Sequence, residues 1–188
     1  MRKKVELTPA DIDLHQAAMD GDVGAAQTAF ASGANVDSPE EEHYITPLLW
    51  ACAFGHFEVA SFLVGAGADV NYADENGDTP LHNAVSIGQI EIVRLLLQHG
   101  ADANHLNASG HTVIEAVAAY ETADVEKRKM VIVALLEAGC NVNARNLQMN
   151  HQTPLMVATE TAAEIGNLEI VRYLISKGAD VNAVDDEQ

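Results

Sequence analysis

Apolar residues recur along the chain in pairs of short segments with helical spacing. Residues 81, 84 and 85 share one helix face, and Gly88 is placed to end that helix. The run from residue 90 to residue 97 is more continuously apolar, which predicts a second helix with a larger buried surface. Thr79 followed by Pro80 is typical of a helix start. Threonine caps the first turn, and the backbone N–H that proline lacks would have no partner inside the helix at this position. The unit therefore reads as helix, turn, helix and loop.

This unit repeats through most of the chain. The tripeptide Thr-Pro-Leu begins at residues 46, 79 and 153, and Thr112 starts a related Thr-Val-Ile in the same phase. A second marker, glycine followed by a small residue and then Asn or Asp, begins at residues 33, 67, 100, 139 and 178. Two independent markers that keep the same phase predict an array of stacked repeats.

The repeat resembles the ankyrin repeat, most clearly in DENGDTPLHNA at 74–84, GQIEIVRLLL at 88–97 and GAD at 100–102. The resemblance implies an all-α solenoid of stacked helix-turn-helix units with projecting hairpin loops. We interpret residues 1–188 as a single domain of this kind. Its five repeats lie at about 7–37, 38–71, 72–104, 105–143 and 144–188.

Three of these repeats depart from the family pattern. The first has Asp13 where the family has proline, so we expect its helix to begin at the capping signal of Thr8. The fourth carries six extra residues around 120–129, and the fifth carries four around 159–165, which we place between the paired helices. The fourth insertion contains three basic residues at 127–129. It is either a helix extension with a solvated charged face or a second contact site.

Composition narrows the possible functions. The chain of 188 residues is 48% apolar but only 5% aromatic, and its formal net charge is −18. A field of that sign repels nucleic acids and anionic lipids, so we expect neither nucleic-acid nor membrane binding. The basic N-terminus is not followed by an apolar signal-peptide core, and two cysteines are too few for a disulfide scaffold. These features favour a soluble cytoplasmic protein.

Catalytic and metal-binding motifs are not found. The sequence contains no G-x-S-x-G, H-E-x-x-H, P-loop or Cys-x-x-Cys pattern, so we expect no enzyme activity and no cofactor. The resemblance implies structural roles for His15, His56 and His82. Four other histidines, at 43, 105, 111 and 151, lie in or near the connecting loops of different repeats, whereas a zinc site needs three or four converging ligands, so we expect no bound metal. We expect Cys52 to be a small buried apolar residue.

The resemblance implies recognition of another protein through a concave surface formed by loops and first helices. Acidic residues gather at two loop tips, 37–42 and 74–78, where they would steer a basic partner; the alternative is a solvated surface that only maintains solubility. The main hypothesis is a non-catalytic protein-binding module with a basic partner. One alternative is an immunity or inhibitor protein that neutralises a cationic toxin or enzyme. Another, from a different class, is a metal-dependent accessory protein or enzyme.

Position within the repeat predicts which residues line the concave surface. We expect Phe54 and Ile87 to be exposed apolar anchors among acidic residues, whereas Trp50 lies one helical position further in and is assigned to the core. The candidates are Glu42, His43, Ile45, Ala53, Phe54, Glu75, Asn76, Asp78, Ser86, Ile87, Ser109, His111 and Tyr120.

The last predicted helix, at about 168–175, is as apolar as an internal one. Terminal repeats usually carry a polar outer face, so we expect this end either to fray or to be covered by a partner, including a second copy. The net charge opposes self-association. We therefore expect a monomer, with a weak dimer as the alternative.

Overall fold

A computed structural model describes residues 6–119, 124–146, 151–165 and 168–185. These residues form ten helices and no strand; the one isolated β-bridge joins Leu106 and Thr112. The helices are α1 (Pro9–Asp20), α2 (Val23–Ala31), α3 (Pro47–Phe54), α4 (Phe57–Gly65), α5 (Pro80–Ser86), α6 (Ile90–Gln98), α7 (Val113–Ala119), α8 (Val125–Glu137), α9 (Pro154–Ile165) and α10 (Glu169–Ser176).

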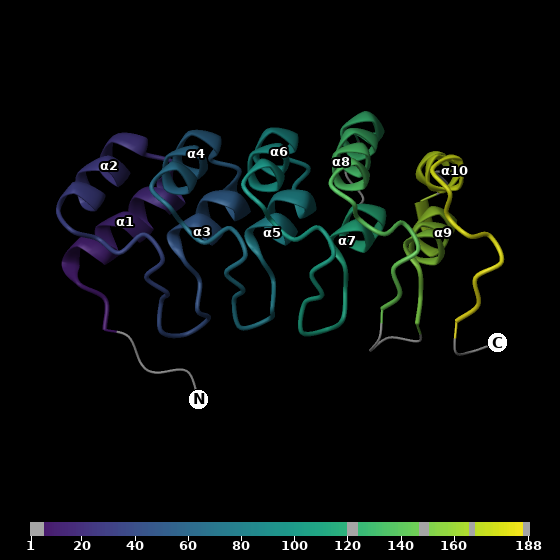
Figure 1. The fold of residues 1–188 in the computed structure, drawn as a ribbon, viewed down its shortest axis with the longest axis horizontal. Helices are drawn as coiled ribbons and strands as arrows, with labels where there is room; N and C mark the ends of the chain where they lie inside the picture. The colour runs from purple at the N-terminus through teal and green to yellow at the C-terminus, as the bar shows by residue number, and fades with distance from the viewer. Residues whose placement is uncertain (1–5, 120–123, 147–150, 166–167, 186–188) are drawn as a thin grey trace.

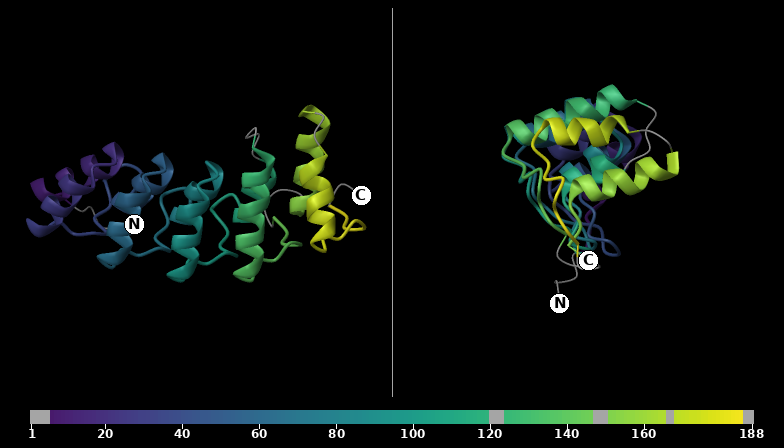
Figure 2. Two further views of the ribbon diagram at one scale, coloured as in Figure 1. Left: turned by 90° about the horizontal axis from the view of Figure 1, so that it is seen from above. Right: turned by 90° about the vertical axis from the view of Figure 1, so that its right-hand side faces the viewer.

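The helices stack in pairs along one axis. The second helix of each pair lies along the top of Figure 1, the first helix lies below it, and the connecting loops project downward. Seen from above, the pairs stand side by side in a single row (Figure 2). The predicted all-α solenoid is confirmed. Below, the surface formed by α3, α5, α7 and α9 together with the projecting loops is called the first-helix face.

The helix starts follow from their capping residues. Thr8 and Asp11 form a reciprocal capping box, in which the Asp11 carboxylate accepts from the Thr8 backbone N–H at 2.8 Å. The predicted start of α1 at Thr8 is therefore confirmed. In α3 the cap is one-sided: the Thr46 hydroxyl accepts from the backbone N–H of Leu49, and Pro47 is the first helical residue. These caps satisfy backbone donors that have no partner inside the helix.

Two glycines between paired helices are required by their conformation and by their neighbours. Gly21 has φ 73° and Gly55 has φ 75°, in the left-handed region that favours glycine. A Cβ atom at Gly21 would lie 2.6 Å from Nδ1 of His56, and one at Gly55 would lie 2.7 Å from Nε2 of Gln89. Each glycine thus lets a side chain of the following repeat pack directly on the turn.

The core runs continuously through the stack. It is built from large aliphatic side chains on both helices of each pair, with alanines where neighbouring first helices approach one another. Burying one such aliphatic side chain contributes roughly 1.5–3 kcal/mol. The fully buried ones include Leu14, Leu48, Leu63, Leu81, Ile92, Leu96, Ile114, Ile132, Leu135 and Leu174.

A row of side-chain hydrogen bonds links successive loops. Asn71, Asn104 and Asn143 each accept from a backbone N–H of the next repeat at 2.8–2.9 Å and donate to a glycine carbonyl there at 3.0–3.2 Å. We call these three residues the asparagine ladder. Asp37 holds the first position of the same row and accepts from Asp69 N–H at 2.9 Å, but a carboxylate has no hydrogen to donate.

The fourth pair corrects the expectation of a solvated charged face. Helix α8 begins at Val125, and Arg128 in its first turns is only 5% exposed. Its guanidinium donates to the carbonyl of Val117 at 2.9 Å and to that of Ala118 at 2.7 Å. The sequence has no glycine between α7 and α8, so this cation satisfies the last carbonyls of α7 and lies at the negative end of its dipole. Lys127, in contrast, is exposed as expected.

The fifth insertion lies elsewhere than expected. Instead of falling between the paired helices, it lengthens the first of them, so that α9 has 12 residues where α5 has seven. In α10, Ile170 and Leu174 are buried, while Leu168 is 50% exposed and Ile175 is 44% exposed. Part of the apolar set in this helix is therefore uncovered, and the oligomeric state stays a prediction.

Candidate functional site

The projecting loops contact one another through their backbones. The backbone N–H of Glu75 donates to the carbonyl of His43 at 3.0 Å, and that of Ala108 donates to the carbonyl of Asn76 at 2.8 Å. The side chains of His43 and Glu75 also form a hydrogen bond, which raises the pKa of His43. The predicted loop residues of three successive repeats thus form one continuous edge of the first-helix face.

Acidic side chains crowd this edge. We call Glu40, Glu42, Asp74, Glu75 and Asp78 the acidic loop cluster. Burial is the main cause that raises the pKa of Glu40; Glu42 and Glu75 add to this effect, whereas His43 opposes it. Burial also raises the pKa of Asp74, with smaller contributions from the carboxylates of Asp78 and Glu75. The carboxyl groups of this edge therefore lie close enough to repel one another, and His43 offsets only part of that charge.

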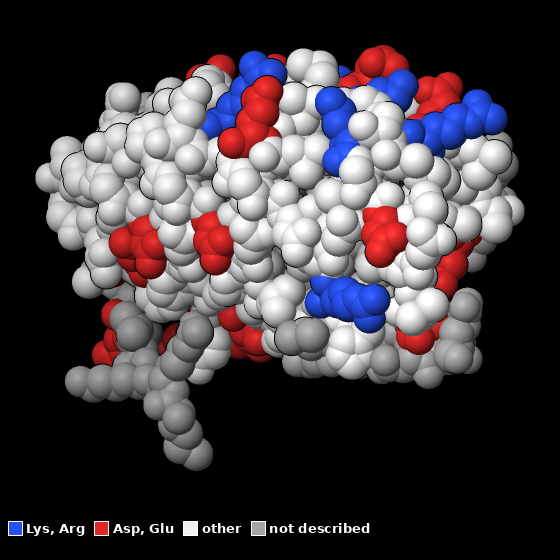
Figure 3. Space-filling view, turned by 45° about the vertical axis from the view of Figure 1, so that its right-hand side comes forward, with Lys and Arg blue, Asp and Glu red and all other residues white. Residues whose placement is uncertain are grey.

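Basic residues lie on a different part of the molecule. In Figure 3 most of the blue surface runs along the upper edge, where the second helices lie. Among the residues that the structure describes, every Lys or Arg except Arg145 belongs to a second helix or directly follows one. These are Arg94, Lys127, Arg128, Lys129, Arg172 and Lys177. The basic residues are therefore concentrated with the second helices, where acidic residues such as Glu58, Glu91 and Glu126 also lie, and none belongs to the loops that carry the acidic loop cluster.

The apolar candidates give a mixed outcome. Phe54 is 53% exposed and stacks on Trp50 with ring centroids 5.6 Å apart. Trp50 packs against the core, as predicted, but remains half-buried. Ile87 is half-buried rather than exposed, because it caps the C-terminus of α5 where the chain turns into α6. Phe54 is thus the more open of the two predicted anchors.

The other candidates are distributed along the same face. Glu42, Asn76 and Ser109 are exposed on loops, whereas Ile45 and Ala53 are half-buried. Tyr120 lies outside the residues that the structure describes.

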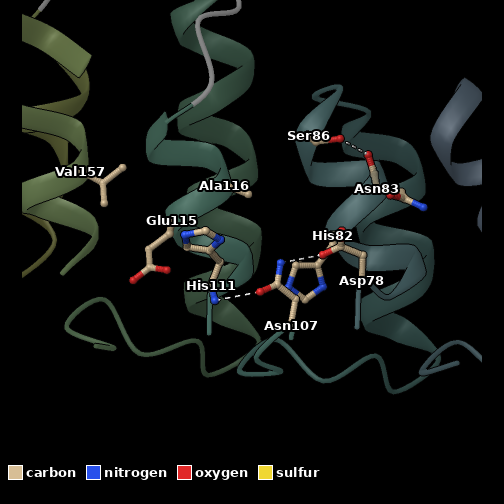
Figure 4. Close-up of a pocket in the computed structure, with 9 residues that line it drawn as sticks. All are labelled: Asp78, His82, Asn83, Ser86, Asn107, His111, Glu115, Ala116 and Val157. Carbon is tan, nitrogen blue, oxygen red and sulfur yellow. Dashed lines mark hydrogen bonds between the residues drawn. The ribbon is translucent and has the colours of Figure 1, made fainter. Parts of the chain in front are cut away.

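A pocket of about 280 Å³ opens on the first-helix face beside the acidic loop cluster (Figure 4). It includes three of the predicted residues, Asp78, Ser86 and His111. Asn107 closes its lower side, donating to Asp78 at 2.9 Å and accepting from the backbone N–H of His111 at 2.9 Å. The full lining is Asp78, His82, Asn83, Ser86, Asn107, His111, Glu115, Ala116 and Val157.

Glu115 is one of the six lining residues that sequence reasoning did not include among the candidates. It is 2% exposed, and its Oε2 atom accepts from the backbone N–H of Thr112 at 2.9 Å, which caps α7. Burial raises the pKa of this carboxyl to about 7. The signal was present in the sequence, because Glu115 holds the position at which the third repeat has His82 in Thr-Pro-Leu-His.

Most histidines of the helices serve structural roles. His15 bonds to the carbonyl of Ser38 at 2.8 Å and His56 to that of Met19 at 2.9 Å, so both join neighbouring repeats as predicted. The described residues contain no cluster of three histidine, cysteine or acidic side chains that could hold a metal. Cys52 is fully buried, as predicted, and burial raises the pKa of its thiol, which opposes a nucleophilic role.

Comparison with known proteins agrees with the repeat pattern. The family model described as ankyrin repeats (3 copies) matches residues 14–107 and 100–185. The human protein named DNA-binding protein RFXANK is 36% identical over 69 residues, which are 35% of this chain and 26% of that protein. The chain therefore matches about a quarter of this relative's length. None of the described helices has the length and apolar character needed to cross a membrane.

Proposed function

Because the chain belongs to the ankyrin repeat family, we propose that it is a non-catalytic module that binds a basic partner protein on its first-helix face. Ankyrin repeats generally mediate protein–protein interaction, and the family is typically non-enzymatic. The human relative is described as DNA-binding, but the net charge of −18 argues against extending that property to this chain.

The observation that carries the proposal is the position of the acidic loop cluster away from the basic residues. The cluster contributes Asp78 to the pocket on the first-helix face, where Phe54 is also exposed, while the described basic residues other than Arg145 lie with the second helices. Crowded carboxylates on one face raise the local concentration of a cationic partner and speed its association.

The test is an association rate measured on matched charge variants. The partner is first captured by cross-linking from cells that express the chain. Its association with the double variant Glu42→Lys/Glu75→Lys is then compared with its association with the double variant Glu58→Lys/Glu91→Lys. All four glutamates are exposed, but the control pair lies on α4 and α6. Both pairs change the net charge equally.

We expect the loop variant to associate roughly tenfold more slowly at low salt, with the difference lost at high salt, because screening removes steering. Equal slowing by both pairs would show that only total charge matters. An unchanged rate in the loop variant would refute binding at the acidic loop cluster.

A further inference from the structure

The pocket beside the acidic loop cluster contains polar atoms without partners. Within the described part of the chain, Oε1 of Glu115 and Nε2 of His82 are buried and make no hydrogen bond of good geometry. Both residues line the pocket, and both are at least 95% buried. A buried polar atom left unpaired costs roughly 1–3 kcal/mol, so native proteins rarely keep one without a reason.

The geometry of Glu115 indicates which kind of hydrogen-bonding group would complete the pocket. Its Oε2 atom is committed to the cap of α7, which leaves Oε1, buried in the wall of the pocket, as an acceptor without a partner. Arg128 does not neutralise this carboxyl, because its guanidinium is bonded to the carbonyls of Val117 and Ala118. The pocket lining contains a second carboxyl, Asp78, and no Lys or Arg.

The ring of His82 carries no positive charge that would repel a cation in the pocket. Its Nδ1 atom accepts from the backbone N–H of Thr79 at 3.3 Å, which places the proton of the neutral ring on Nε2. Burial lowers the pKa of His82; the Asp78 carboxylate and the His111 backbone act in the opposite direction more weakly. The ring therefore stays neutral at neutral pH, and the net charge of the lining comes from carboxyl groups.

We propose that this pocket, the anchor pocket, receives a single basic side chain, lysine or arginine, from the partner protein. The charged head donates to Oε1 of Glu115 and lies near Asp78, while the aliphatic stem lies along Ala116 and Val157. The inference rests on the proposed function, which it makes specific to one residue of the ligand. A volume of about 280 Å³ suits one side chain, since pockets for drug-sized ligands span about 300–1,000 Å³.

The position of the pocket supports this assignment. It is built by three successive repeats, with Asp78 and His82 from one, Asn107 and Glu115 from the next and Val157 from α9. A peptide that crosses the first-helix face therefore passes directly over it (Figure 4). A charged hydrogen bond in this partly enclosed site is stronger than one at the exposed loop tips, so the anchor pocket acts on affinity more than on encounter rate.

The experiment uses a displayed library of random dodecapeptides selected on the immobilised full chain. We expect each enriched family to contain one essential Lys or Arg. Replacing that residue by norleucine or citrulline should weaken binding at least tenfold. At pH 8, where the Glu115 carboxyl is mostly ionised, Glu115→Gln keeps the oxygen that caps α7 but removes the charge, and should weaken binding of the basic peptide to the level of its neutral analogue.

Glu91→Gln on α6 is the matched control, because it removes one exposed carboxylate far from the pocket and should leave affinity unchanged. Ala116→Leu is a second variant that fills the pocket without touching the cap, and it should also block the basic peptide. Thermal unfolding verifies that each variant is folded.

Two outcomes overturn the inference in different ways. Enriched peptides that need no basic residue, or that bind Glu115→Gln and Ala116→Leu as tightly as the wild type, would refute the anchor pocket and leave the proposed function standing. A selection that enriches no peptide would count against peptide recognition by this face, and therefore against both.

Discussion

Asp37 should lower the stability of the stack, and a single substitution at this position should raise it. It occupies the first position of the row continued by the asparagine ladder, and it already accepts from the Asp69 N–H at 2.9 Å. At the next position, Asn71 also donates to the carbonyl of Gly100 at 3.0 Å. The corresponding carbonyl for residue 37 is that of Gly67. Asp37→Asn supplies the missing donor without changing the size of the side chain.

The expected gain has two sources. One added hydrogen bond contributes about 1 kcal/mol to the free energy of unfolding. In addition, burial and the neighbouring Asp69 carboxylate raise the pKa of Asp37 above its ordinary value of 3.8. The folded state therefore holds this proton more tightly than the unfolded state, and the carboxylate lowers stability once the pH exceeds that value. The gain from Asp37→Asn should thus be larger at pH 7 than at pH 3.5.

Urea unfolding followed by circular dichroism at both pH values measures this effect. In thermal unfolding of a chain of this size, the same 1 kcal/mol corresponds to a shift of roughly 2–4 °C in the midpoint temperature. The reverse substitution, Asn104→Asp, is the control, because it removes a donor to the Gly139 carbonyl at 3.1 Å and should destabilise by a similar amount. If Asp37→Asn leaves stability unchanged while Asn104→Asp lowers it, the row is not uniform and the reasoning fails.

Three further predictions concern single groups. The wild type should lose stability, by at most about 3 kcal/mol, as the pH rises from 4.5 to about 7, and Glu115→Gln should remove this loss. Urea unfolding at pH 5 and pH 8 measures the difference. The nearby His82 and Asp78 are present in both proteins, so equal pH dependence would contradict the raised pKa of Glu115. Arg128→Met should destabilise by about 2–4 kcal/mol, because it leaves two buried carbonyls unpaired, and Lys127→Met, with an exposed side chain, should have little effect in the same assay. Glu75→Gln should move the NMR-titrated pKa of His43 back toward 6.5, and an unchanged value would show that their hydrogen bond does not form in solution.

The sequence predicted the regular part of this molecule because that part is encoded locally. A Thr-Pro start, an apolar helical stripe and a glycine stop act within a few residues, so the helix limits of the third repeat could be predicted closely. The role of His56 could be predicted from the family resemblance. The half-burial of Ile87 could not, since it depends on how the turn before α6 packs.

The irregular parts were missed because their contacts are not local. Arg128 reads as one of three consecutive basic residues, and its burial depends on α7 ending without a glycine cap. Glu115 reads as an ordinary helix-start acid, and its burial depends on Asn107 and Val157 from other segments closing a pocket around it. The environment of Glu115 is set by repeats stacked on each other, whereas that of Arg128 is set by the other helix of its own pair.

These irregularities converge on one helix. The two ends of α7 are held by groups that the regular repeat does not use, Glu115 at the start and Arg128 near the end. Local departures from a stable pattern usually lower stability, and proteins keep them where they serve recognition. The buried carboxyl oxygen without a partner fits this reasoning, because it lies on the face where the acidic loop cluster would direct a cation. If the fourth repeat carries specificity, a chain with Glu115→His should be more stable at pH 8 than the wild type and should lose its preference for a basic anchor residue.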